Sequence, residues 1–114
     1  GLKARCYLAE GEEKCWTGDT IRAKRYFPAW VVDEDSELVQ GAMKGLKDAG
    51  IEAKLSHFAF CTNGSSFCGE AGIPCIGYGP SLESLAHVRD EYIEIDQLTK
   101  ACKGFECILA QLTK

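Results

Sequence analysis

The apolar run at residues 73–78 is the feature that most constrains the fold of this chain. Its length and composition are those of a short buried strand, and Gly79 and Pro80 follow as strand-terminating residues. Residues 96–112 predict a helix, because their apolar side chains recur at steps of three and four residues and form one stripe. A buried strand next to a one-sided helix indicates that helices cover a sheet.

Residues 31–114 alternate between helical and extended patterns, whereas residues 1–30 are more polar and suggest a hairpin. Asp96 is the expected N-cap of the last helix, and Ser65 or Ser66 that of a shorter one. We therefore predict an α/β fold with a helix-flanked mixed sheet. The expected elements are strands at 4–9 and 20–27, a helix at 34–49 that Gly50 ends, one bent or two short strands at 51–60, a short helix from 65 to Gly72, a strand at 73–78 and a helix at 96–112.

Length and charge limit the classes of function that the chain can have. A chain of 114 residues suffices for one modest domain, and 26% charged with 46% apolar residues is ordinary globular composition. The net charge of −4 offers no general attraction to nucleic acid or to an anionic membrane surface. No apolar run approaches the ~18–20 residues of a membrane span, and no signal pattern is present. We therefore expect a cytoplasmic protein with no nucleic-acid or membrane partner.

The seven cysteines favour reduced thiols over a zinc module or a disulfide scaffold. Their number is odd, and no pair has the Cys-x-x-Cys spacing of a structural zinc site or a redox pair. Cys75 falls within a predicted strand and Cys102 on the apolar face of a predicted helix, where free cysteine behaves as a small apolar residue. A thiol redox protein is therefore the least favoured class of function.

His87 follows the glycine-rich loop at the end of the predicted 73–78 strand, where open α/β sheets bind their ligands. Asp90 and Glu91 are close enough in sequence to orient its imidazole as hydrogen-bond acceptors. A single histidine in a loop is more often only solvated. The residues alone leave both interpretations open.

The segment Thr62-Asn63-Gly64-Ser65-Ser66 joins a predicted strand to a predicted short helix. A helix N-terminus offers unpaired backbone N–H groups and the positive end of a dipole, so it could hold an anion such as a substrate carboxylate. The same residues are equally typical of ordinary turn and cap chemistry. Two further candidates are more typical of solvated surface residues than of a functional site. They are Glu12-Glu13, in a predicted polar turn, and His57, at the rim of a predicted strand.

Residues 58–110 resemble the C-terminal signature of the M20 family of zinc-dependent peptidases and aminoacylases. Two motifs carry the resemblance: Thr-Asn-Gly at 62–64, and Ala-His-x-x-Asp-Glu at 86–91. The segment Tyr26-Phe27-Pro28-Ala29-Trp30 is similar to the exit from the lid domain of that family. The nearest branch comprises acetylornithine deacetylase, succinyl-diaminopimelate desuccinylase and carboxypeptidase-like enzymes.

The resemblance implies a role for each of these motifs in a two-zinc amidohydrolase. His87 would be a zinc ligand, with Asp90 and Glu91 supporting it. Members of the family hold two zinc ions that share a water, from which a general-base glutamate removes a proton before attack on an amide carbonyl. The implied substrate is a small N-acylated amino acid or peptide. Four residues would line the substrate side: Thr62, Asn63, Gly64 and Gly79.

Other parts of the family's active site have no counterpart in this sequence. There is no His-x-Asp motif, no Glu-Glu pair at the end of an apolar strand and no lid histidine, and thus no catalytic residue. The resemblance therefore implies a C-terminal portion, with residues 1–30 as a remnant of the lid and dimerisation domain with its linker and 31–114 as the last segment of the catalytic domain. We expect this portion alone to be inactive and to bind zinc weakly or not at all, whereas full-length enzymes of the family commonly form homodimers.

A second hypothesis from another class also fits the residues. The chain would then be an autonomous small α/β module whose glycine-rich loop and helix N-terminus bind an anionic metabolite. The flanking reading frame distinguishes the two hypotheses, because an upstream His-x-Asp motif and Glu-Glu pair would favour the enzyme.

Overall fold

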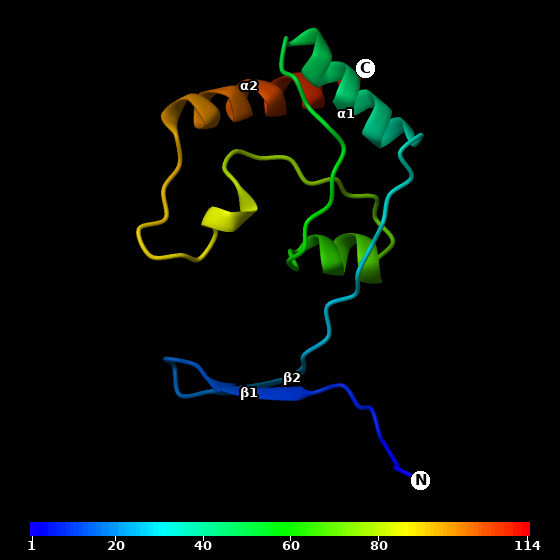
Figure 1. Cartoon of the computed structure of the whole chain (residues 1–114), viewed down its shortest axis with the longest axis vertical. Coiled ribbons are helices and arrows are strands. Elements are labelled where there is room, and N and C mark those ends of the chain that lie inside the picture. Colours follow the sequence, from blue (N-terminus) through cyan, green and yellow to red (C-terminus); the bar gives the residue numbers. More distant parts are fainter.

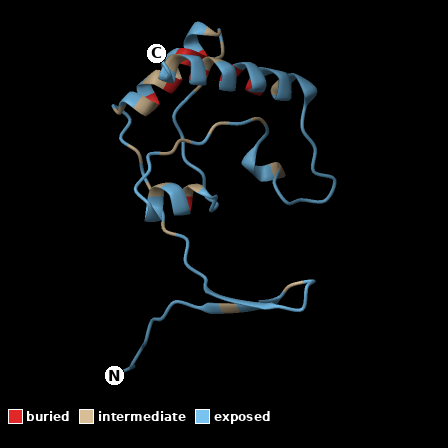
Figure 2. Ribbon diagram, turned by 180° about the vertical axis from the view of Figure 1, so that it is seen from behind, coloured by how far each residue is buried: buried red, intermediate tan, exposed pale blue.

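In the computed structural model, which describes residues 1–114, the chain is extended, with a hairpin at one end and two packed helices at the other (Figure 1). Its radius of gyration is 18.6 Å, compared with roughly 13 Å for a compact domain of this length. Only 8 of 114 residues are buried, and most of them lie where the two long helices meet (Figure 2). The elements in chain order are β1 Glu10–Lys14, β2 Thr20–Lys24, α1 Glu37–Asp48, the π-helical turn η1 Ser65–Glu70, the 3-10 turn η2 Glu83–Leu85 and α2 Ile95–Leu112.

β1 and β2 form an antiparallel hairpin in which opposite charges face one another. Glu12 is paired with Arg22 across the ladder, and their side chains form an ion pair of 2.8 Å. Glu13 accepts a hydrogen bond of 3.4 Å from Arg25. The predicted hairpin is confirmed, but its first strand lies at 10–14 rather than 4–9. Glu12 and Glu13 consequently belong to a strand and not to the predicted turn, because cross-strand ion pairs favour this register.

α1 begins and ends close to the bounds predicted for it. Ser36 is the N-cap, and its hydroxyl accepts a hydrogen bond of 3.4 Å from a backbone N–H of the first turn. Gly50, with a φ of 70°, follows the last turn as the predicted stop. Lys103 of α2 donates a hydrogen bond of 3.1 Å to the carbonyl of Ala49, which satisfies one of the open acceptors at the end of α1.

α1 packs against α2, and this contact forms the core of the chain (Figure 2). Ala42 and Leu46 of α1 and Ile108 of α2 are buried together. Ala101 and Gly104 of α2 are buried as well, and their small size allows the helices and the neighbouring chain to approach closely. Four partly buried residues of the connecting segments pack against this cluster: Ile51, Ala53, Ile76 and Tyr78.

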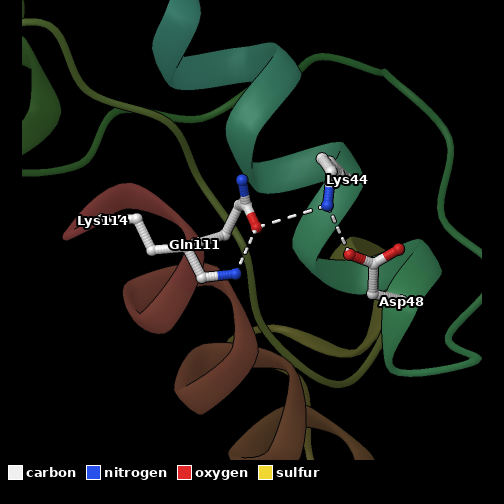
Figure 3. Close-up of polar contacts among 4 residues, drawn as sticks. All are labelled: Lys44, Asp48, Gln111 and Lys114. Carbon is white, nitrogen blue, oxygen red and sulfur yellow. Dashed lines mark hydrogen bonds and ion pairs between the residues drawn. The ribbon is translucent and has the colours of Figure 1, made fainter.

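Polar side chains of α1 and of the C-terminal end of the chain contact one another at one edge of the α1–α2 interface (Figure 3). Nζ of Lys44 lies 2.6 Å from Oδ2 of Asp48 and 3.4 Å from Oε1 of Gln111, which Lys114 also contacts at 3.0 Å. The hydrogen bond from Lys44, together with its charge, lowers the pKa of Asp48. Because the Lys44–Asp48 pair is exposed, it adds little to the stability of the fold.

α2 covers the residues predicted to be helical, but its capping and its buried face differ from the prediction. The N-cap is Glu94, which makes no side-chain cap bond, and Asp96 lies in the first turn. The Asp96 carboxylate therefore acts on the positive end of the helix dipole and does not cap the helix. Leu98, Phe105 and Leu109 are 47%, 46% and 61% exposed, so no sheet covers the wide apolar stripe of α2. No helix of the structure combines the length and the apolar character that a membrane crossing needs.

Residues 51–60 and 73–78, predicted as strands, pair with no strand in the structure. They run as irregular segments, and parts of each pack against α1 and α2. The apolar side chains of these segments predict burial but do not specify whether a strand or a helix covers them. The chain thus has the predicted mixture of helix and strand, but the helix-flanked mixed sheet is absent and the only sheet is the β1–β2 hairpin.

All seven cysteines are free thiols. Cys75 lies in an irregular segment rather than in a strand, and its Sγ contacts the carbonyl oxygen of Ile73 at 3.1 Å. Cys102 is exposed instead of lying on a buried helix face. The residues of α2 that are buried are Ala101, Gly104 and Ile108, which leaves Cys102 outside the contact with α1.

Candidate functional site

The Thr62–Gly64 turn is held together by its own hydrogen bonds. The Thr62 hydroxyl accepts from the N–H of Gly64 at 3.0 Å, and the Thr62 carbonyl accepts from that of Ser65 at 3.0 Å. The carbonyl of Asn63 accepts from the N–H groups of Ser66 and Phe67, both at 3.1 Å. The N–H groups predicted to be open to an anion therefore already have partners, and the segment shows ordinary turn chemistry. Ser65 and Ser66, expected as caps, lie within η1, which has no side-chain cap bond.

The segment that follows β2 contacts η1 and its N-cap at two points. A Cβ atom added to Gly64 would lie 2.6 Å from Cζ2 of Trp30, and one added to Gly69 would lie 2.8 Å from Cγ of Pro28. Each glycine is therefore covered by a ring that leaves no room for a side chain. Trp30 is half-buried, so the contact holds the segment between the hairpin and α1 against the Thr62–Gly64 turn.

The loop that carries His87 has an unusual backbone. Ser81, His87 and Asp90 have φ angles of 79°, 59° and 58°, in the left-handed region that residues other than glycine seldom adopt. Oε2 of Glu91 accepts a hydrogen bond of 3.0 Å from the backbone N–H of His87. Glu91 thus holds the main chain at His87, whose side chain is exposed. Strained backbone of this kind is concentrated at functional sites in proteins.

Two side chains fasten this loop to other parts of the chain. Oε1 of Gln97, in α2, accepts a hydrogen bond of 2.7 Å from the N–H of Ser81. Oε1 of Glu83, in η2, accepts one of 3.0 Å from the N–H of Ala59. The second bond ties the His87 loop to the segment that leads into the Thr62–Gly64 turn. Glu83 and Gln97 were not predicted from the sequence, and no local pattern signals them because each contact joins residues at least sixteen positions apart.

Gly79 and Glu91 both line a hollow with a volume of about 260 Å³. The rings of Phe58 and Phe60 are stacked with centroids 5.0 Å apart, and both line the same hollow. Its remaining lining residues are Pro80, Ser81, Leu82, Glu83 and Ala86. The structure therefore brings Gly79 and Glu91 together, whereas the five other predicted site residues do not line this hollow: Thr62, Asn63, Gly64, His87 and Asp90.

Tyr78 anchors the segment that leads into Gly79. Its hydroxyl lies over Gly104, where an added Cβ atom would clash with it, and its ring meets that of Phe105 edge-on with centroids 5.0 Å apart. Burial raises the pKa of Tyr78 above its ordinary value of 10.0, and the charge of Cys107 raises it further. The same aromatic contact that positions the segment thus keeps this hydroxyl protonated to higher pH.

The residues of this chain do not form a metal centre by themselves. No group of three or more His, Cys, Asp or Glu side chains is placed to hold a metal ion. His87 is exposed in its loop, and His57 is exposed in the irregular segment after α1 rather than at the rim of a strand. A metal site that used His87 would need further ligands from outside this sequence, since metal ions in proteins require three or four.

Most of the chain, residues 13–111, matches the model of peptidase family M20/M25/M40. The chain belongs to this family. Membership of the M20 family confirms the resemblance that the motifs within residues 58–110 carried, at the level of the family. The fold and the loops described above are therefore those of an M20 sequence.

The known proteins that are similar to this M20 chain are much longer than the part of each that aligns with it. The uncharacterized protein YgeY of Escherichia coli (strain K12) is 38% identical over 77 residues, which are 67% of this chain and 19% of that protein. A Pyrococcus horikoshii protein named "Putative LysW-lysine/LysW-ornithine hydrolase" is 26% identical over 87 residues, which are 76% of this chain and 27% of that protein. The chain thus spans less than a third of the relatives that it matches. No solved structure matches it.

Proposed function

We propose that this M20 chain is the C-terminal part of a metal-dependent amidohydrolase that cleaves the amide bond of a small N-acyl amino acid or peptide. The observation that carries the proposal is the match of residues 13–111 to the peptidase family. The name of the Pyrococcus relative, which is that of a hydrolase, supports a hydrolytic reaction. The branch of deacetylases, desuccinylases and carboxypeptidase-like enzymes supplies the substrate class.

The division into residues 1–30 and 31–114 is part of this proposal. The first part is a remnant of the lid and dimerisation domain with its linker, and the second is the last segment of the catalytic domain. β1 and β2 contact each other and not the helices, while α1 and α2 contact each other, which supports a boundary between the two pairs. The small share of each relative that aligns with the chain supports a longer parent protein.

In the whole enzyme His87 is a zinc ligand, and the other ligands and the general base come from outside this sequence. The Glu91 carboxylate supports His87 by accepting a hydrogen bond from the backbone N–H of His87, and Asp90 belongs to the same strained loop. Four residues form the substrate side: Thr62, Asn63, Gly64 and Gly79. The Glu83–Ala59 hydrogen bond, which joins the two loops, supports their assignment to one site.

The remaining parts of the proposal concern the surroundings of the enzyme. We place the whole enzyme in the cytoplasm as a homodimer, with a small acylated amino acid or peptide as its ligand and neither nucleic acid nor membrane as a partner. The net charge of −4 supports the exclusion of nucleic acid as a partner. The anion-binding module loses support, because the N–H groups at the start of η1 are engaged within the turn.

The experiment is to express the whole reading frame that contains this sequence and to assay it with N-acetyl and N-succinyl amino acids and with dipeptides. We expect release of free amino acid that stops when a chelator removes the metal and returns when zinc is added back. The control is the same enzyme treated with chelator already saturated with zinc, which should keep its activity. Absence of amide hydrolysis across the panel, or hydrolysis that survives metal removal, would contradict the proposal.

A further inference from the structure

Two residues of the segment between β2 and α1 share one face and dock on the Thr62–Gly64 turn and on η1. Pro28 and Trp30 are two positions apart, and in an extended chain such residues lie on the same side. Their rings cover Gly69 and Gly64. Because this segment leads directly from the hairpin, the two contacts fix where the hairpin leaves the rest of the molecule (Figure 1).

The Trp30 contact reaches the backbone of the turn itself. A Cβ atom on Gly64 would lie 2.6 Å from Cζ2 and 2.9 Å from Cε2 of Trp30, and 3.0 Å from the hydroxyl oxygen of Thr62. The indole ring and the Thr62 hydroxyl therefore flank Gly64 closely. The same hydroxyl accepts the hydrogen bond from the N–H of Gly64. A shift of the ring would thus displace the backbone that orients Thr62.

The other tryptophan provides a comparison within the same chain. Trp16, in the turn of the hairpin, is 97% exposed and covers nothing. Trp30 is half-buried, although the segment that holds it has no regular secondary structure. The docking of Trp30 is therefore specific to its place opposite Gly64.

We infer that Trp30 is a positioning residue for the Thr62–Gly64 turn and couples the placement of the hairpin to the substrate side of the site. The inference rests on the proposed function, which assigns this turn to the substrate. Trp30 acts through Gly64 and Thr62 and does not itself contact substrate. Movement of the hairpin is transmitted to the turn through the indole ring.

The kinetic test uses the whole enzyme and the variants Trp30→Ala, Trp30→Phe and Gly64→Ala, with Trp16→Ala as the matched control. We expect Trp30→Ala and Gly64→Ala to raise KM about tenfold while kcat changes by less than about threefold, because the turn is misplaced and the chemistry is intact. Trp30→Phe should raise KM much less than Trp30→Ala does, since a ring remains against Gly64. Trp16→Ala should match the wild type. A fall in kcat with unchanged KM, or equal effects of Trp30→Ala and Trp16→Ala, would overturn the inference.

A fluorescence measurement tests the contact independently of activity. In the 114-residue chain carrying Trp16→Phe, Trp30 is the only tryptophan. Adding Gly64→Ala should shift its emission to longer wavelength and raise its quenching by acrylamide, because the methyl group displaces the ring into water; adding Ser66→Ala, at an exposed position of η1, should change neither.

An unchanged emission in the Gly64→Ala protein would overturn the inference whatever the kinetics. If the emission shifts but the wild-type enzyme hydrolyses no amide, the proposed function fails, and the role of Trp30 toward a substrate fails with it, although the contact itself stands. The two failures are therefore distinguishable.

Discussion

Oε1 of Gln97 accepts a hydrogen bond of 2.7 Å from the backbone N–H of Ser81. Gln97 lies in the first turn of α2, and Ser81 has a φ of 79°, in the region that favours glycine. The helix thus holds a strained residue two positions after Gly79, in the loop that leads to His87. The position of this loop depends on a side chain from another element.

Replacing Gln97 with alanine should loosen this loop. We expect the free energy of unfolding to fall by about 0.5–1 kcal/mol, as is usual for a single exposed hydrogen bond, and the amide of Ser81 to exchange faster with solvent. Gln97→Glu retains an acceptor oxygen at the same place and should stay close to the wild type. Amide hydrogen exchange and chemical denaturation check both variants, and equal protection of Ser81 in wild type and Gln97→Ala would show that the bond does not hold the loop.

The raised pKa of Tyr78 predicts a loss of stability at alkaline pH. Below the ordinary pKa of 10.0 the hydroxyl is protonated in both states, so its packing contributes fully. As the pH rises through the folded pKa, the unfolded state has already lost its proton, and the folded state is destabilised relative to it. Denaturation measured between pH 8 and about 11 should show a decline that is smaller in Tyr78→Phe. An identical decline in the variant would assign it to other groups.

Replacement of His87 tests its proposed role in the whole enzyme. Asparagine is the best substitute, because it adopts a positive φ more readily than most residues and adds no strain to the loop. We expect His87→Asn to change the free energy of unfolding by less than about 0.5 kcal/mol, since the side chain is exposed. Metal content should fall, and turnover should drop by more than the ~10–100-fold that is typical of losing an outer partner of a metal site.

His57→Ala is the control for this variant, since His57 is also exposed but lies outside the proposed site. It should keep the metal content and nearly all of the turnover. A His87→Asn enzyme that retained both would remove His87 from the metal site.

The 114-residue chain on its own should not hydrolyse N-acyl amino acids, even with added zinc or cobalt. No three of its potential metal ligands lie close enough together to hold an ion. We therefore expect it to bind zinc with a dissociation constant no better than about micromolar. Isothermal titration calorimetry measures the affinity, and the amino acid release assay measures the activity. Tight binding of two metal ions together with turnover would show that the chain is a complete enzyme.

Some parts of the structure follow from short stretches of sequence. The end of α1 before Gly50 and the extent of α2 depend on interactions within about one helical turn, and both were predicted closely, whereas α1 begins at Glu37 after the Ser36 cap rather than at 34. Membership of the M20 family likewise followed from the motifs at 62–64 and 86–91. These features are local, so the order of residues is enough to specify them.

The strands were less predictable, because a strand exists only with a partner. Residues 73–78 have the composition of a buried strand, yet Ile76 and Tyr78 pack against the α1–α2 cluster instead of entering a sheet. The first strand of the hairpin was misplaced for a similar reason, since the Glu12–Arg22 pair across the ladder decides the register.

The sequence by itself determined the two long helices, the presence of a hairpin and the family, whereas the tertiary structure decided the register of the hairpin and how the candidate site is held. The Gln97–Ser81 and Glu83–Ala59 hydrogen bonds and the Trp30–Gly64 contact join residues that are distant in the chain. The positive φ of His87 is accompanied by a hydrogen bond from its backbone N–H to the carboxylate of Glu91, four positions further along the chain. Such features depend on which segments meet in space, and that is settled by packing of the whole chain rather than by local preference.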